Sequence, residues 1–145
     1  TDVAEECLDR IATAIGHKRF LPACFQVIAS FANDGANWKR RHAALMGLSQ
    51  VVEIMPDNKD QLKEVVHLVL RFANDDPHPR VRYAAINAIG QISNDQGPRV
   101  QNEHHAGVVG ALLRALDDAG APRVQAHAAA AIINFCDMCC GAIGW

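Results

Sequence analysis

The sequence repeats itself at an interval of about 41 residues. When the chain is displaced by 41 positions, Phe31-Ala32-Asn33-Asp34 falls on Phe72-Ala73-Asn74-Asp75. When it is displaced by 43 positions, Pro79-Arg80-Val81 falls on Pro122-Arg123-Val124. Agreement at two neighbouring displacements indicates several copies of one structural unit. We therefore predict a fold of stacked repeats, each of which contacts its neighbours.

Each unit has the hydrophobic pattern of two helices. Apolar residues recur at helical spacing, as in Leu62, Val65 and Val69. The segments Pro56-Asp57-Asn58 and Gly97-Pro98 interrupt the pattern between units. The pattern predicts first helices over residues 20–32, 59–74 and 102–116, second helices over 38–55, 79–93 and 122–138, and a lone second helix over 3–15.

Two-helix repeats of about 40–47 residues are typical of HEAT and armadillo proteins. We therefore predict an all-α superhelix, a HEAT-repeat solenoid of about three and a half repeats, whose second helices line the concave face. The repeats are expected at residues 18–56, 59–96 and 101–140, and residues 1–16 supply the second helix of a preceding repeat. Half of the 145 residues are apolar, but only 6% are aromatic and 24 are alanine. A core of aliphatic residues and closely packed alanine helices is therefore expected.

The composition argues against several function classes. A net charge of -2 and a pI near 6.3 give no basic surface for nucleic-acid phosphates. No apolar run reaches the ~18 residues that would indicate a membrane-spanning helix. Five cysteines without a visible secretory signal are expected to be reduced thiols. Because the chain starts at Thr1 without a methionine, we interpret it as a piece of a longer protein.

Three strings resemble the HEAT repeats of one transport family. They are Trp-Lys-Arg-Arg-His-Ala at 38–43, Asp-Pro-His-Pro-Arg-Val-Arg-Tyr-Ala-Ala at 76–85 and Arg-Val-Gln-Ala-His-Ala-Ala-Ala-Ala at 123–131. In this order and spacing they resemble the importin-β (karyopherin-β) family. The resemblance implies a central segment of a larger nuclear import receptor, which shuttles between cytoplasm and nucleus.

The resemblance also implies the partners. Such a receptor binds basic nuclear localisation signals of cargo proteins, passes the nuclear pore through Phe-Gly nucleoporins, and releases its cargo when Ran-GTP binds. Ran contacts in this family are concentrated in N-terminal repeats. We therefore expect Ran binding of the full-length receptor rather than of this segment.

Acidic residues recur on the second helices at intervals of about one repeat. Glu53, Asp95 and Asp137 take near-equivalent positions toward the C-terminal ends of these helices. A series of carboxylates on one face would attract lysine and arginine, and asparagine amides can hold the backbone of an extended peptide. The predicted cargo-binding residues are Asp9, Glu53, Asn87, Asp95, Asn134 and Asp137. The resemblance implies all of them except Asp137, since its next acidic position falls on Met138.

Other conspicuous side chains are expected to have structural roles. Trp38 opens a second helix, where we expect it to pack between repeats. Arginines at the starts of the second helices, such as Arg41 and Arg82, are expected to pair with acids in neighbouring turns. Those acids are also expected to cap the following helices, and they are Asp34, Asp75 and Asp118.

Neither a metal site, nor a cofactor site, nor a catalytic site is predicted. Cys136 and Cys140 share a helix face near Cys139, but zinc needs four convergent ligands and no second pair is evident. Glu103-His104-His105 lacks the spacing of a metalloprotease motif. The sequence contains no Ser-His-Asp grouping and no glycine-rich phosphate loop that would support catalysis.

Two rival functions stay open for a HEAT-repeat protein. A scaffold subunit of a phosphatase complex would have shorter and more regular repeats, and it would bind folded partners through its loops. The irregular repeat length here favours the importin interpretation. A HEAT-repeat metal hydroxylase would need paired His-Glu dipeptides at helix starts, which the sequence lacks, and metal analysis of the purified protein tests that interpretation.

Overall fold

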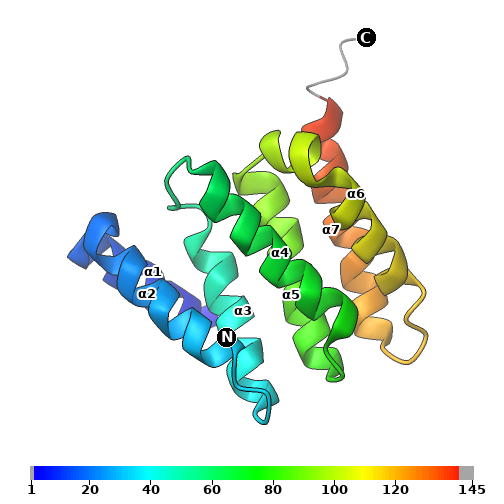
Figure 1. Cartoon of the computed structure of the whole chain (residues 1–145), viewed down its shortest axis with the longest axis horizontal. Helices are drawn as coiled ribbons and strands as arrows, with labels where there is room; N and C mark the ends of the chain where they lie inside the picture. Colours follow the sequence, from blue (N-terminus) through cyan, green and yellow to red (C-terminus); the bar gives the residue numbers. More distant parts are fainter. Residues whose placement is uncertain (1, 141–145) are drawn as a thin grey trace.

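The computed structural model describes residues 2–140, in which seven helices alternate between two layers (Figure 1). The first helices are α2 (His17–Ala32), α4 (Lys59–Asp75) and α6 (Arg99–Leu116). The second helices are α3 (Trp38–Val51), α5 (Pro79–Asp95) and α7 (Pro122–Cys140), preceded by α1 (Asp2–Ile15). The predicted all-α solenoid is confirmed, and the division into repeats at the stated residues stays a prediction. None of the described helices combines the length and apolar character needed to cross a bilayer.

The second helices stack directly on one another. Helix α3 packs on α5 and α5 packs on α7, while α4 packs on α6 in the other layer. Because α3, α5 and α7 run in the same direction, their N-terminal ends share one edge and their C-terminal ends share the opposite edge (Figure 1). We call the surface formed by α1, α3, α5 and α7 the second-helix face. The candidate site includes the edge formed by the C-terminal ends of α3, α5 and α7.

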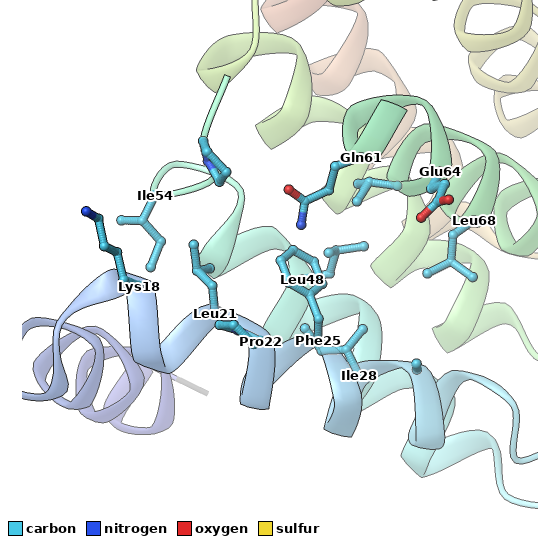
Figure 2. Close-up of a pocket in the computed structure, with 13 residues that line it drawn as sticks. Lys18, Leu21, Pro22, Phe25, Ile28, Leu48, Ile54, Gln61, Glu64 and Leu68 are labelled. Carbon is cyan, nitrogen blue, oxygen red and sulfur yellow. The ribbon is translucent and has the colours of Figure 1, made fainter. Parts of the chain in front are cut away.

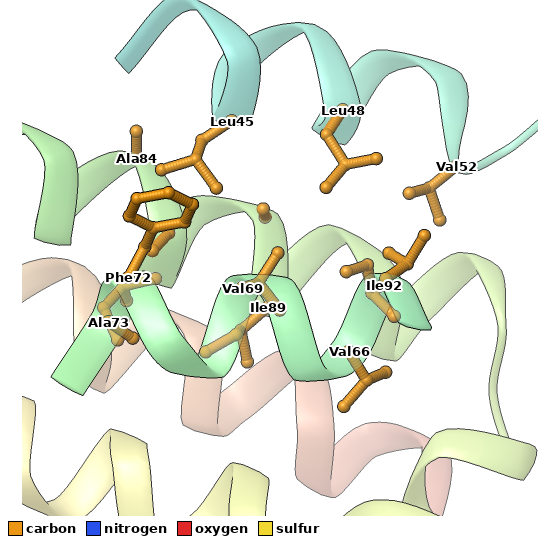
Figure 3. Packing of buried hydrophobic residues seen from close by; sticks show 14 of the residues in the cluster. Leu45, Leu48, Val52, Val66, Val69, Phe72, Ala73, Ala84, Ile89 and Ile92 are labelled. Carbon is orange, nitrogen blue, oxygen red and sulfur yellow. The ribbon is translucent and has the colours of Figure 1, made fainter. Parts of the chain in front are cut away.

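The core lies between the layers and is built mainly from aliphatic side chains and alanine, with a few phenylalanines such as Phe72 (Figure 3). Its largest fully buried side chains include Leu45, Leu48, Leu62, Ile86, Ile89, Ile92 and Leu112. Ala84, Ala85 and Ala88 of α5 have no exposed surface. At Gly90 the backbone of α5 comes so close to α7 that an added Cβ would lie 3.4 Å from the Ala131 Cβ. Small residues therefore let neighbouring second helices stack closely.

Polar side chains and one glycine set the starts of the helices. Gly16 separates α1 from α2 with a φ of 85°, a conformation that other residues rarely adopt. Asn37 is the N-cap of α3 and His78 is the N-cap of α5, and their side chains accept hydrogen bonds from backbone amides. The predicted caps from Asp34 and Asp75 are therefore wrong. Asp34 instead accepts a hydrogen bond from the Asn37 backbone N–H at 3.0 Å.

Three helix boundaries differ most from the prediction, and several others differ by one or two residues. Helices α2 and α6 begin earlier than predicted, at His17 and Arg99. Helix α3 ends at Val51 rather than at residue 55. Pro56 has no N–H to donate to the Val52 carbonyl and disfavours helical backbone at Met55, so the predicted last turn does not continue the helix. The carbonyl of Val52, the C-cap residue, accepts a hydrogen bond from Gln96 Nε2 at 3.0 Å. A side chain of the next repeat thereby satisfies a carbonyl at the helix end.

Candidate functional site

The C-terminal edge of the second-helix face carries the predicted acidic residues. Asp95 is the last residue of α5, and Asp137 is exposed in the last turn of α7. Glu53 is also exposed, but it lies in the turn that follows α3 and not on the helix as predicted. Since the three helices run in parallel, the three carboxylates follow one another along a single edge.

The position of these acids strengthens the negative potential of the edge. The last turns of α3, α5 and α7 contain no basic residue. The C-terminal end of a helix already carries a partial negative charge, so a carboxylate there opposes the favourable arrangement by about 0.3–1 kcal/mol. Carboxylate and helix dipole therefore act in the same direction on a cation. Both make the potential at this edge more negative, at some cost to folding.

The Asp95 side chain is less accessible than those of Glu53 and Asp137. Its side chain is half-buried, and Oδ2 accepts a hydrogen bond from Gln91 Nε2 at 2.9 Å. Met138, at the position where the resemblance expects an acid, packs its side chain on the turn at Gly97. An added Cβ at Gly97 would lie 2.8 Å from the Met138 Cε. Met138 therefore has a packing contact, and the exposed acid next to it is Asp137.

Asn87 lies in the middle of the second-helix face and bridges three helices. Its Nδ2 donates a hydrogen bond to Ser49 Oγ of α3 at 3.4 Å, and its Oδ1 lies 2.9 Å from His127 Nε2 of α7. Asn134 also lies where α5 meets α7, with its Nδ2 3.4 Å from the position of an added Cβ on Gly90. Both predicted asparagines are half-buried. The structure thus brings Asn87 and Asn134 to the same helix contact.

The remaining predicted residue, Asp9, belongs to α1. Its side chain lies outside the part of the chain that the structure describes. Its part in the site stays a prediction.

Two polar residues beside Asn87 were not predicted. Ser49 and His127 contact Asn87 from the helices on either side, and the His127 ring packs against the Tyr83 ring with centroids 4.6 Å apart. A signal for them exists in the sequence. Ser49, Asn87 and His127 recur at about one repeat length, as polar positions on otherwise apolar helix faces.

The N-terminal edge of the second-helix face carries arginine and aromatic side chains. The rings of Trp38 and His78 stack with centroids 3.9 Å apart, which agrees with the predicted packing of Trp38 between repeats. Arg80 lies over the same tryptophan ring, 5.7 Å from its centroid. Arg82 pairs with Asp118, one of the expected acids. Arg41, by contrast, pairs with Asp76, the residue after the expected Asp75. The buried Arg41 therefore joins neighbouring repeats, whereas the acids of the other edge face solvent or are half-buried.

The cysteines near the C-terminus do not gather ligands around a point. Cys136 is exposed, and the Cys139 thiol donates a hydrogen bond to the Phe135 carbonyl at 3.4 Å. The side chain of Cys140 lies outside the described residues. Within the described part of the chain, no group of three or more histidine, cysteine or acidic residues is arranged to hold a metal ion.

A separate apolar groove lies between the first helices α2 and α4. Figure 2 shows Leu21, Phe25 and Ile28 of α2 on one side of the groove and Leu68 of α4 on the other. Lys18 and Glu64 also line the groove, which has a volume of about 750 Å³. The groove is lined mainly by apolar side chains, so its chemistry differs from that of the acidic edge.

Known proteins share this sequence and fold. The HEAT repeats profile matches residues 26–133. Importin subunit beta-3 of Saccharomyces cerevisiae is 36% identical over 138 residues, which are 94% of this chain and 12% of that protein. Kap121p, solved bound to RanGTP and bound to Ste12p, has a TM-score of 0.85 and 36% identity over 94% of this chain and 13% of that chain.

A variant of Kap121p is also similar. In this variant three acidic residues, separated by about one repeat, are replaced by lysine. It has a TM-score of 0.83 and 34% identity over 92% of this chain and 13% of that chain. The present chain thus spans 12% to 13% of the length of these relatives. The chain belongs to the HEAT-repeat family, and the relatives it matches within that family are importins, the karyopherin transport receptors.

Proposed function

We propose that this chain is the cargo-binding part of a nuclear import receptor similar to importin-5, also called karyopherin beta-3. It binds Lys-rich nuclear localisation signals in an extended form along the concave second-helix face. The observation that carries this proposal is the series of carboxylates at the C-terminal edge, Glu53, Asp95 and Asp137, on three parallel helices. Asn87 and Asn134 lie further along the same helices, where a peptide backbone would run.

The relatives support this proposal in two ways. Kap121p has been solved with Ste12p and with RanGTP, so a protein of the same fold binds another protein and Ran. The Kap121p variant replaces three acids with lysine at an interval of about one repeat. Asp9, Glu53 and Asp95 are separated by a similar interval in this chain.

The binding free energy is the sum of several weak contacts. An exposed ion pair contributes only ~0–1 kcal/mol, so no single carboxylate holds a signal. Three or four lysines that meet successive acids, together with hydrogen bonds from Asn87 and Asn134 to the peptide backbone, reach a useful affinity. Because Glu53 and Asp137 are exposed and Asp95 is only half-buried, salt screens these acids. Binding is therefore strongest at low ionic strength.

Fluorescence anisotropy with a labelled Lys-rich peptide tests the proposal. The control peptide has glutamine at each lysine position and the same length. We expect the Lys-rich peptide to bind more tightly than the control and to weaken as salt rises. Equal affinity for the two peptides, or affinity that does not depend on salt, would contradict the proposed function.

The apolar groove between α2 and α4 supports a second part of the proposal. Phe25, Leu21 and Leu68 give it the chemistry to take up an aromatic side chain (Figure 2). We propose that Phe-Gly nucleoporins bind the full-length receptor here and at similar grooves, and that the receptor shuttles between cytoplasm and nucleus and binds Ran-GTP. A Phe-Gly peptide should shift the NMR signals of α2 and α4, whereas a Ser-Gly peptide should not.

A further inference from the structure

Three polar side chains form a directional chain of hydrogen bonds across the second-helix face. Ser49 Oγ donates its hydrogen to the Met46 carbonyl at 2.7 Å. Ser49 Oγ is therefore free to accept, and it accepts from Asn87 Nδ2 at 3.4 Å. The carboxamide oxygen of Asn87 can only accept, so His127 Nε2, at 2.9 Å, must be the donor. The hydrogen bonds thus run in one direction, from α7 through α5 to α3.

The chain of hydrogen bonds fixes both His127 and Asn87. Burial lowers the pKa of His127 below its ordinary value of 6.5, so the ring is neutral at pH 7. A neutral ring that donates from Nε2 carries its hydrogen there and not on Nδ1. Contact with the Tyr83 ring holds the imidazole in place. The Asn87 carboxamide then points its nitrogen toward α3 and its oxygen toward α7.

Asn87 keeps binding capacity in this orientation. A carboxamide has two N–H donors and two acceptor lone pairs. Ser49 uses one donor and His127 uses one lone pair, which leaves one N–H and one lone pair for a ligand. These are the two groups needed to bind the N–H and C=O of an extended peptide. A carboxamide that is already oriented loses less entropy when the peptide binds.

We propose that His127 and Ser49 are positioning residues, which orient the Asn87 carboxamide for the backbone of the cargo peptide. This inference depends on the proposed function, because it assumes that a Lys-rich peptide lies across Asn87. His127 has the larger effect, since its hydrogen bond is 2.9 Å long and that of Ser49 is 3.4 Å long. Neither residue needs to touch the peptide.

The test compares variants of the whole chain in the peptide-binding assay. His127→Leu removes the donor, whereas His127→Gln keeps an N–H at the same number of bonds from Cα. In His127→Leu the Asn87 carboxamide loses one hydrogen bond that orients it, so the Kd should rise about three- to tenfold. We expect His127→Gln to restore the Kd to within about twofold of the unchanged chain. Thermal unfolding of each variant checks that the chain is folded at the assay temperature.

A double-mutant cycle separates positioning from general structural damage. Asn87→Ala removes the group that is oriented, so His127→Leu should weaken binding no further in that background. Equal loss in His127→Leu and His127→Gln would overturn the proposal. So would a loss from His127→Leu that is as large with Asn87→Ala as without it.

Nitrogen-15 NMR tests the hydrogen-bond chain without any peptide. We expect the His127 ring at pH 7 to carry its proton on Nε2, and a proton on Nδ1 would overturn the proposal. If the unchanged chain binds the Lys-rich peptide no better than the glutamine control, the proposed function fails instead. In that case the NMR result still decides whether His127 orients Asn87.

Discussion

Arg41 of α3 forms a buried, bidentate ion pair with Asp76, which lies in the turn before α5. Arg41 Nε donates to Asp76 Oδ2 at 2.7 Å, and Nη2 donates to Oδ1 at 3.2 Å. Nη1 donates to the carbonyls of Asp34 and Gly35, so one guanidinium ties two turns together. Hydrogen bonding to the Asp76 carboxylate raises the pKa of Arg41. Arg82 and Asp118 form an equivalent ion pair in the next repeat.

Removal of the Asp76 carboxylate should destabilise the chain strongly. Only 8% of the Arg41 side chain and 3% of the Asp76 side chain are exposed. Asp76→Ala leaves a buried guanidinium without its counter-charge, which typically costs about 3–5 kcal/mol. We expect a loss of this size in the free energy of unfolding, measured by guanidinium denaturation.

Two further variants serve as controls for that measurement. Asp75→Ala changes the neighbouring exposed acid and should stay within about 0.5 kcal/mol of the unchanged chain. The loss of unfolding free energy in Asp118→Ala should lie between the losses in Asp75→Ala and Asp76→Ala, because the ion pair of Asp118 with Arg82 is about one-fifth exposed. Equal losses in Asp75→Ala and Asp76→Ala would contradict the assignment of Asp76 as the buried partner.

The repeat and its helices could be predicted from the sequence, because hydrophobic spacing and length determine them. The partner of Arg41 could not. Asp75 and Asp76 are adjacent in sequence, and only the end of α4 decides which one points inward. Asp75 is the last helical residue and is exposed, whereas Asp76 has extended backbone and is buried. Such one-residue differences depend on tertiary packing at helix ends.

Charge reversal at the acidic edge should weaken peptide binding. In the double variant Glu53→Lys/Asp95→Lys, two attractive positions become repulsive for lysine. We expect the Kd for a Lys-rich peptide to rise at least about tenfold, since each lost pair contributes up to ~1 kcal/mol and repulsion adds to it. Fluorescence anisotropy at low salt measures this change.

A matched control keeps the same change in net charge. Asp75→Lys/Asp117→Lys alters two exposed acids at the C-terminal ends of α4 and α6, away from the acidic edge. Its Kd should stay within about twofold of the unchanged chain, because salt screens distant charges. Unchanged affinity in a folded Glu53→Lys/Asp95→Lys chain would rule out the acidic edge as the cargo site.

The candidate site could be predicted only in part. Acids at a repeated interval can be found in the sequence, because a carboxylate carries its charge in any backbone conformation. The orientation of Asn87 is not visible, since it depends on Ser49 and His127 from two other helices. Glu53 was predicted on a helix, and the effect of Pro56 on the end of α3 moves it into a turn. Residues far apart in sequence thus determine the details that a ligand would meet.

Acidification should destabilise the folded chain. Burial lowers the pKa values of His42, His104 and His127 from the ordinary value of 6.5, and Arg80 and His78 add to the effect at His42. The unfolded chain therefore binds protons at a higher pH than the folded chain does. The free energy of unfolding should fall as the pH drops from about 7.5 to about 5.5.

Replacement of two of these histidines should reduce that pH dependence. In His104→Gln/His127→Gln the groups that titrate differently in the two states are lost, so the difference in unfolding free energy between the two pH values should shrink. Denaturant unfolding at both pH values measures it. An unchanged or larger difference in the double variant would show that other groups cause the acid sensitivity.

Gly97 should not tolerate a methyl group. An added Cβ would lie 2.8 Å from both the Ser93 carbonyl oxygen and the Met138 Cε. Met138 is flexible and can move, but the Ser93 carbonyl is backbone and also accepts a hydrogen bond from Gln101. Gly97→Ala should therefore lower the free energy of unfolding by about 1–3 kcal/mol, and Met138→Ala in the same chain should not restore it. Gly35→Ala is the control, since its added Cβ meets nothing within 4 Å. Equal thermal stability of the Gly97→Ala and Gly35→Ala chains would show that the turn before α6 can move away from Ser93.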